Sequence, residues 1–97
     1  MTTLQETEVL DSAIDKHLMS IIETYARYGS SIINSYSIIK VILKKLGLWR
    51  NNESKIEHRK VVERINERIE VSTLLVHVED GYGAKKWYEI NINELNE

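Results

Sequence analysis

Two groups of basic side chains are the residues in this sequence whose type and spacing could do chemistry. The first group falls within ten residues and consists of Lys55, Arg59, Lys60 and Arg64. The second lies beside a glycine-containing turn and consists of Lys85 and Lys86, followed by the aromatic Trp87. Guanidinium and ammonium groups bind phosphate oxygens and donate hydrogen bonds to base edges. An exposed indole can stack on a sugar or base, or dock on a partner chain. The two groups therefore predict a surface that contacts nucleic acid.

Each group also has a plainer interpretation, which the sequence leaves open. Glu63 and Glu67 follow the arginines at spacings of three or four residues, as in ion pairs within one solvated helix surface, each worth only ~0.2–0.5 kcal/mol. Lysines at the mouth of a hairpin also discourage edge-to-edge pairing of strands. Contact with nucleic acid and simple solvation both remain possible for these residues.

Catalytic patterns are missing from the sequence. Without cysteine there is no disulfide, no thiolate metal site and no thiol nucleophile. His17, His58 and His77 fall on three different predicted elements, without metal-ligand spacing. The serines lack the Gly-x-Ser-x-Gly turn of a nucleophile, and no helix follows Gly81–Gly83 as a phosphate loop requires. We therefore expect that the protein is not an enzyme and that it binds neither a cofactor nor a metal ion.

Composition and charge fit one folded domain over residues 1–97. The chain is 42% hydrophobic with a formal net charge of −2, which argues against a protein that coats nucleic acid indiscriminately. Residues 29–50, however, contain four bases and no acid. Of these, Lys44, Lys45 and Arg50 could contact a phosphate backbone, although lysines in the last turn of a helix equally complement its dipole. The sequence has neither a signal-peptide pattern nor 18 consecutive apolar residues, so we expect a cytoplasmic protein without a membrane partner.

Apolar periodicity predicts helices over residues 8–28, 36–46 and 55–69. Gly29 and Gly47 fit the positions just past the first two helices, where a left-handed residue is common. Ser35 or Ser37 would cap the second helix, and Ser54 to Glu57 reads as a capping box that starts the third. Leu48-Trp49 is expected to pack back on the second helix.

Alternating residues predict a β-hairpin over residues 71–93. Placing both apolar sets on one face requires three pairs: Val78 with Tyr88, Val76 with Ile90, and Leu74 with Ile92. The same register sets His77 opposite Glu89 and Glu79 opposite Trp87. Ile32-Ile33 is either a helical turn or a short strand that pairs with this hairpin, and we favour the strand.

This order of elements resembles the winged helix-turn-helix superfamily from about Leu10 to Asn93, in patterning rather than in a sequence signature. The implied fold is α+β: three helices followed by a two-stranded β-hairpin wing, with a possible extra strand near Ile32-Ile33. The resemblance implies sequence-specific or structure-specific binding of double-stranded DNA by a transcriptional regulator, with the third helix in the major groove and the hairpin on the backbone. The stretch from Gly47 to Glu53 is longer than the usual turn of the motif. The composition also fits archaeal, viral or plasmid proteins.

The first helix has more apolar width than one small domain needs. We therefore expect a homodimer formed through this helix, with Leu10, Ile14 and Leu18 as the contact residues. A different class of function is a winged-helix module that binds protein instead of DNA, using Trp87, Trp49 or the first helix.

Overall fold

The computed structural model describes the backbone of residues 3–47, 55–83 and 85–95, and side chains from Glu8 in the first helix and from Arg59 in the third. The chain has an α+β fold. Its elements are α1 (Thr3–Arg27), β1 (Ile32–Asn34), α2 (Ser35–Lys45), α3 (Lys55–Val71), β2 (Leu75–Asp80), β3 (Lys86–Ile90) and α4 (Ile92–Leu95). The short α4 was not predicted. The other helices and the β1 strand lie where the sequence predicted them, within a few residues at their ends.

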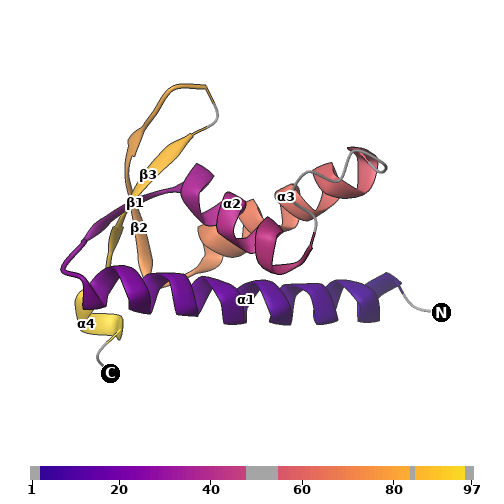
Figure 1. Cartoon of the computed structure of the whole chain (residues 1–97), viewed down its shortest axis with the longest axis horizontal. Helices are drawn as coiled ribbons and strands as arrows, with labels where there is room; N and C mark the ends of the chain where they lie inside the picture. The colour runs from indigo at the N-terminus through magenta and orange to yellow at the C-terminus, as the bar shows by residue number, and fades with distance from the viewer. Residues whose placement is uncertain (1–2, 48–54, 84, 96–97) are drawn as a thin grey trace.

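Helix α1 runs along the length of the molecule, and α2 and α3 lie on one side of it (Figure 1). The strands stand at the end where α1 stops, and the tip of the β2–β3 hairpin points away from α1. The short α4 lies next to the last turns of α1, close to the C-terminus. The hairpin and the start of α3 are thus at opposite ends of the molecule.

Isoleucine dominates the single hydrophobic core. All three long helices and the inner face of the sheet contribute to it, through Ile14, Leu18, Ile21, Ile22, Ile33, Ile38, Ile42, Leu43, Ile65, Ile69, Leu75, Tyr88 and Ile90. The apolar stripe predicted on α1 is confirmed, since its side chains at three- and four-residue spacing point into this core. Helix α2 ends as predicted at Gly47, where φ is +76° and the N–H donates to the Lys44 carbonyl.

The N-cap of α2 is Asn34 rather than the predicted Ser35 or Ser37. The Asn34 side chain accepts a hydrogen bond from the Ser37 N–H at 2.9 Å while its backbone is still extended. Strand β1 therefore runs directly into the helix, which leaves Ser35 for another role. Its buried hydroxyl accepts the Lys86 N–H at 3.0 Å and joins α2 to β3. The capping box at Ser54 and the packing of Trp49 lie outside the described residues.

The three strands form an antiparallel sheet in the order β1-β3-β2, which confirms the strand predicted at Ile32-Ile33. Strand β1 pairs Ile33 with Tyr88. Strand β2 pairs Leu75 with Ile90 and His77 with Tyr88, and then Glu79 with Trp87. Val78 is the extra residue of a β-bulge between these two registers.

The bulge makes most of the predicted hairpin register wrong. Only the Glu79–Trp87 pair is confirmed. Tyr88, Glu89 and Ile90 each pair with the residue one position before the predicted partner, and Ile92 begins α4 instead of pairing with Leu74. Leu75, not Leu74, enters the strand core at 6% exposure, and Val76 and Val78 are each 50% exposed. Leu74 and Leu75 are adjacent, so either of them can begin the series of alternate residues that faces the core. In addition, α4 begins at Ile92, where the predicted register needed a strand.

Candidate nucleic-acid interface

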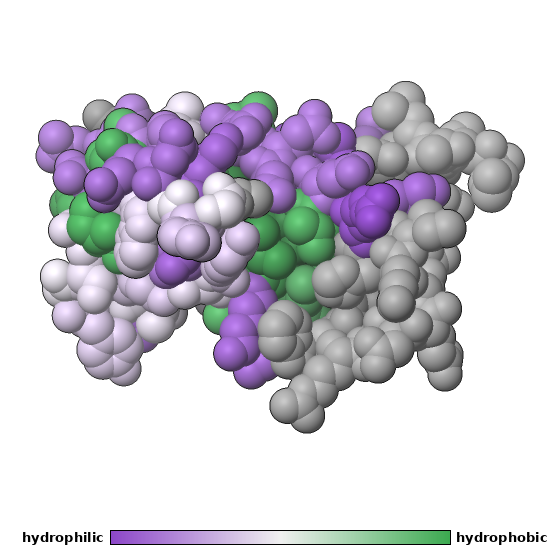
Figure 2. Space-filling view, turned by 90° about the horizontal axis from the view of Figure 1, so that it is seen from above, coloured by the Kyte–Doolittle hydropathy of each residue, from purple (hydrophilic) through white to green (hydrophobic). Residues whose placement is uncertain are grey.

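Helix α3 presents bases in its first half and acids in its second half. Arg59 and Lys60 are exposed, and neither takes part in an ion pair among the described residues. Glu63, Glu67 and Glu70 are exposed further along the helix. Figure 2 shows hydrophilic residues along one long edge of the molecule and a hydrophobic patch beside them, near the middle of the view. Only the first half of α3 is suited to contact with phosphate.

Arg64, predicted as a DNA contact, is turned toward α1 instead. Its Nε donates to Asp11 Oδ1 at 3.1 Å, its Nη2 donates to Asp11 Oδ2 at 2.5 Å, and its Nη1 pairs with Glu67. The hydrogen bonds to Asp11 are the main reason why the pKa of Arg64 is raised. Donors already used by two carboxylates are poorly placed to contact DNA. Arg64 therefore holds α3 against α1.

Arg68 repeats this arrangement one turn later. Its Nε and Nη2 donate to the two carboxylate oxygens of Asp15, both at 2.8 Å, and this contact raises the pKa of Arg68. We call Arg64, Arg68, Asp11 and Asp15 the interhelix clamp. The prediction missed it, although each helix shows a four-residue spacing of like charges that could have indicated it.

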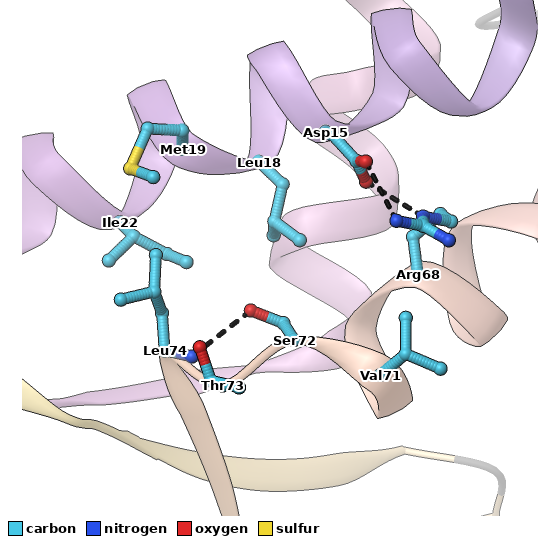
Figure 3. A pocket seen from close by; sticks show the side chains of 9 residues that line it. All are labelled: Asp15, Leu18, Met19, Ile22, Arg68, Val71, Ser72, Thr73 and Leu74. Carbon is cyan, nitrogen blue, oxygen red and sulfur yellow. Dashed lines mark hydrogen bonds and ion pairs between the residues drawn. The ribbon is translucent and has the colours of Figure 1, made fainter. Parts of the chain in front are cut away.

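A groove of about 270 Å³ lies beside the clamp, between α1 and the turn that follows α3. Figure 3 shows the Asp15–Arg68 pair at one end and Leu18, Ile22 and Leu74 along the apolar floor. The Ser72 hydroxyl is occupied within the chain, because it accepts the Leu74 N–H at 3.2 Å. The groove offers apolar contact and few available polar groups.

The two lysines of the hairpin point to different places. Lys85 Nζ lies 5.1 Å from the centre of the Trp87 ring and 5.9 Å from that of Tyr36 on α2, which are cation–π distances. Lys86 Nζ lies 3.5 Å from Glu70 at the end of α3. Tyr82 at the tip is 94% exposed, and sequence reasoning did not single it out. Lys85, Tyr36 and Trp87 therefore form one surface cluster, while Lys86 joins the sheet to α3.

The remaining predicted contact residues are scattered. Lys44 and Lys45 are exposed in the last turn of α2, as expected for residues at the negative end of a helix dipole. Arg50 and the side chain of Lys55 lie outside the described residues. His77, predicted to face Glu89, bonds Asp80 at 2.9 Å and packs against the Tyr88 ring instead. The structure thus leaves Arg59, Lys60 and Lys85 as the best-placed members of the predicted set.

The residues predicted for dimerisation belong to the chain's own core. Ile14 is fully buried, Leu18 is 4% exposed, and Leu10 is partly buried against the same cluster. A second chain cannot pack on side chains that the first already covers. The large apolar residues that α1 does expose are Val9, at 66%, and Met19, at 41%.

Two further classes of site find no support in the described part of the chain. No group of three or more histidines, cysteines or carboxylates lies close enough there to hold a metal ion. No helix in that part is long and apolar enough to cross a membrane. Comparison of the chain with protein families, curated proteins and solved structures gives no match.

Proposed function

We propose that this protein is a winged helix-turn-helix protein that binds double-stranded DNA and regulates transcription. The observation that carries the proposal is the order of elements, α1-β1-α2-α3-β2-β3, together with the strand order β1-β3-β2. The order of the elements is the one that the sequence resemblance implies, with the hairpin directly after the third helix. In this proposal α3 enters the major groove and the hairpin lies on the backbone.

The charges on α3 decide which part of the helix makes the contact. Arg59 and Lys60 lie in its first half, and recognition helices contact base edges mainly through their first turns. Glu63 lies one turn after Arg59 on the same exposed surface of α3, so in this arrangement the phosphate contacts are confined to the residues before it. Lys85 and Tyr82 would make the hairpin contacts, and Lys44 and Lys45 are secondary candidates for the backbone.

The test is the dependence of DNA affinity on salt concentration. A substitution that removes one lysine or arginine from a phosphate lowers the slope of log affinity against log salt by about 0.9. We expect Arg59→Ala, Lys60→Ala and Lys85→Ala each to weaken binding and lower this slope. Lys16→Ala, which removes an exposed base from α1, is the matched control and leaves both unchanged. Failure to bind any duplex at low salt would end the proposal.

A second candidate is a protein-interaction module on the same scaffold. The observation that favours it is the run of exposed acids Glu63, Glu67 and Glu70 on the outer surface of α3, which repels phosphate. The variant Glu63→Gln separates the two candidates, because it raises DNA affinity if α3 lies in a groove. Capture of a partner from nuclease-treated extract, together with unchanged DNA affinity in that variant, favours the protein-interaction module.

We also propose that the DNA-binding form is a homodimer through α1. Because Leu18 and Ile14 are internal, the contact would use Val9, Met19 and the nearby Val71, which is 62% exposed. Light scattering of the chain and of Val9→Lys with Met19→Lys checks this. A monomer at micromolar concentration for the unaltered chain contradicts it.

A further inference from the structure

The face of the sheet that points away from the helices exposes apolar side chains in the described part of the chain. Residues directly opposite each other on antiparallel strands share a face, so Ile32, Glu89 and Val76 form one row across the three strands. The next row contains Trp87 and Glu79. Ile32 is 43% exposed and Val76 50% exposed. We call Ile32, Val76, Val78, Trp87 and Glu89 the outer sheet face.

An open hollow extends this face toward α4. It has a volume of about 370 Å³ and is lined by Val76, Glu89, Ile90, Asn91, Ile92 and Asn93. Ile92, which begins α4, is 41% exposed at its edge. The hollow has both apolar and polar lining residues, and it joins the strand surface to the start of α4.

The charged strand residues on this face are acids. Glu89 lies in the centre of the apolar row, and Glu79 pairs with Trp87 at the hairpin end. Among the three strands the only lysine is Lys86, whose side chain reaches Glu70 of α3 on the other face of the sheet. Lys85, in the turn, places its ammonium group 5.1 Å from the centre of the Trp87 ring, at the hairpin end of this face. A partner here must therefore supply both apolar groups and positive charge.

We propose that the outer sheet face docks a basic amphipathic helix of a partner protein. Strands about 4.8 Å apart make a three-stranded face about 10 Å wide, which matches the diameter of one helix. Strand β3 has five residues and is about 17 Å long, the length of a helix of about 11 residues. An apolar stripe covers Ile32 and Val76, and flanking lysines or arginines reach Glu89 and Glu79.

The charge pattern decides against two other occupants. Two copies of this chain meeting through the same face would bury Glu89 of each copy against apolar side chains and other acids, which is destabilising. DNA is repelled by the same carboxylates. The docking site is thus separate from the surface of α3 proposed for DNA, and either proposal can fail alone.

A defined peptide pair tests the docking site. The probe is a capped 12-residue helical peptide with leucine at the first, fourth, fifth and eighth positions and lysine elsewhere, and the control peptide has glutamate in place of each lysine. Binding is followed by amide chemical shifts of the full chain and by Trp87 fluorescence in a Trp49→Phe background. We expect saturable binding of the lysine peptide only, with shifts confined to β1, β2, β3 and α4.

Variants then assign the binding to the outer sheet face. Glu89→Lys is expected to weaken the lysine peptide at least about tenfold, since it replaces an attraction by a repulsion. Val76→Thr, which keeps a strand-forming side chain, is expected to weaken it several-fold. Glu23→Lys removes an exposed acid from α1 and leaves affinity unchanged.

Four outcomes overturn the proposal. They are no saturable binding, equal loss in Glu89→Lys and Glu23→Lys, shifts centred on α3, and concentration-dependent shifts of the outer sheet face without peptide, which would mean that a second copy occupies it. If the docking site is correct, Glu89→Lys weakens the lysine peptide but does not weaken DNA binding. Loss of DNA binding in Arg59→Ala, by contrast, tests only the proposed function.

Discussion

Arg68 and Asp15 form a two-pronged ion pair, with Nε to Oδ1 and Nη2 to Oδ2 both at 2.8 Å, that joins the helix proposed to read DNA to the longest helix of the molecule. The same contact is made four residues earlier by Arg64 and Asp11. Planar guanidinium groups hold carboxylates in a fixed orientation. The clamp therefore fixes the direction of α3 relative to α1.

The clamp predicts a measurable coupling between the two helices. Arg68 and Asp15 are 31% and 45% exposed, so solvent screening limits their coupling energy to about 0.5–1 kcal/mol. A double-mutant cycle of Arg68→Ala and Asp15→Ala by urea unfolding should give this value, and less at 1 M salt. Arg68→Lys should lose most of it, because an ammonium group cannot form the fork. A cycle of Arg68→Ala with Glu23→Ala is the control and should be additive.

Burial on α1 predicts opposite outcomes for two apolar residues of the same helix. Ile14 is fully buried, so Ile14→Ala should lower the free energy of unfolding by about 2–5 kcal/mol, because burial is reduced and a cavity is left behind. Val9 is 66% exposed, and Val9→Ala should change it by less than about 0.5 kcal/mol. Denaturant unfolding at a concentration where the chain is monomeric measures both. Equal effects would contradict the placement of Ile14 in the core.

The hairpin turn predicts a local change at Trp87. A Cβ at Gly81 would lie 3.1 Å from Trp87 Nε1 and 3.2 Å from Lys85 Cδ, so Gly81→Ala should displace the indole and shift its emission in a Trp49→Phe background. Gly29→Ala is the contrast. A Cβ at Gly29 meets no atom within 4 Å, but the φ of +78° is unfavourable for alanine. The substitution should therefore lower the free energy of unfolding by about 1–2 kcal/mol and leave Trp87 emission unchanged.

Tyr88 predicts a loss of stability at alkaline pH. Burial raises the pKa of its hydroxyl above the ordinary value of 10, because the charged phenolate is desolvated in the fold. The folded state thus holds its proton more tightly than the unfolded state, so stability is full below about pH 10 and falls as pH rises toward the folded pKa. Melting temperatures at pH 7 and pH 11 should show a smaller alkaline loss in Tyr88→Phe. Tyr82→Phe, at the exposed tip, should behave like the unaltered chain.

The positions of the helices could be predicted from the sequence because their signals are local. Apolar spacing placed the core stripe of α1, and Gly47 marked the end of α2. The choice of Asn34 over Ser35 as a cap depends on where β1 ends and on the Lys86 N–H that Ser35 accepts, 51 residues away. Local patterns contain no information about such a partner.

The site was harder to predict than the fold for the same reason. Arg64 lies on the same charged stretch as Arg59 and Lys60, and only the packing of α3 against α1 shows that Asp11 takes its donors. The sequence shows how wide the apolar surface of the first helix is, but it does not show which residues of the same chain cover that surface. This is why Leu10, Ile14 and Leu18 were predicted to contact a second chain. In the hairpin, the prediction of which residues share a face depends on strict alternation along each strand. One bulged residue therefore shifted the register of every pair between Val78 and the base of the hairpin.

The bulge also means that the hairpin contains one residue more than its hydrogen-bonded ladder uses. Deleting Val78 would leave Leu75 opposite Ile90, His77 opposite Tyr88 and Glu79 opposite Trp87, so every side chain would keep its face. What would change is the outer edge of β2, which would become straighter and easier for another strand to extend. The surplus residue thus bends the open edge of this small sheet and leaves one valine half exposed to water.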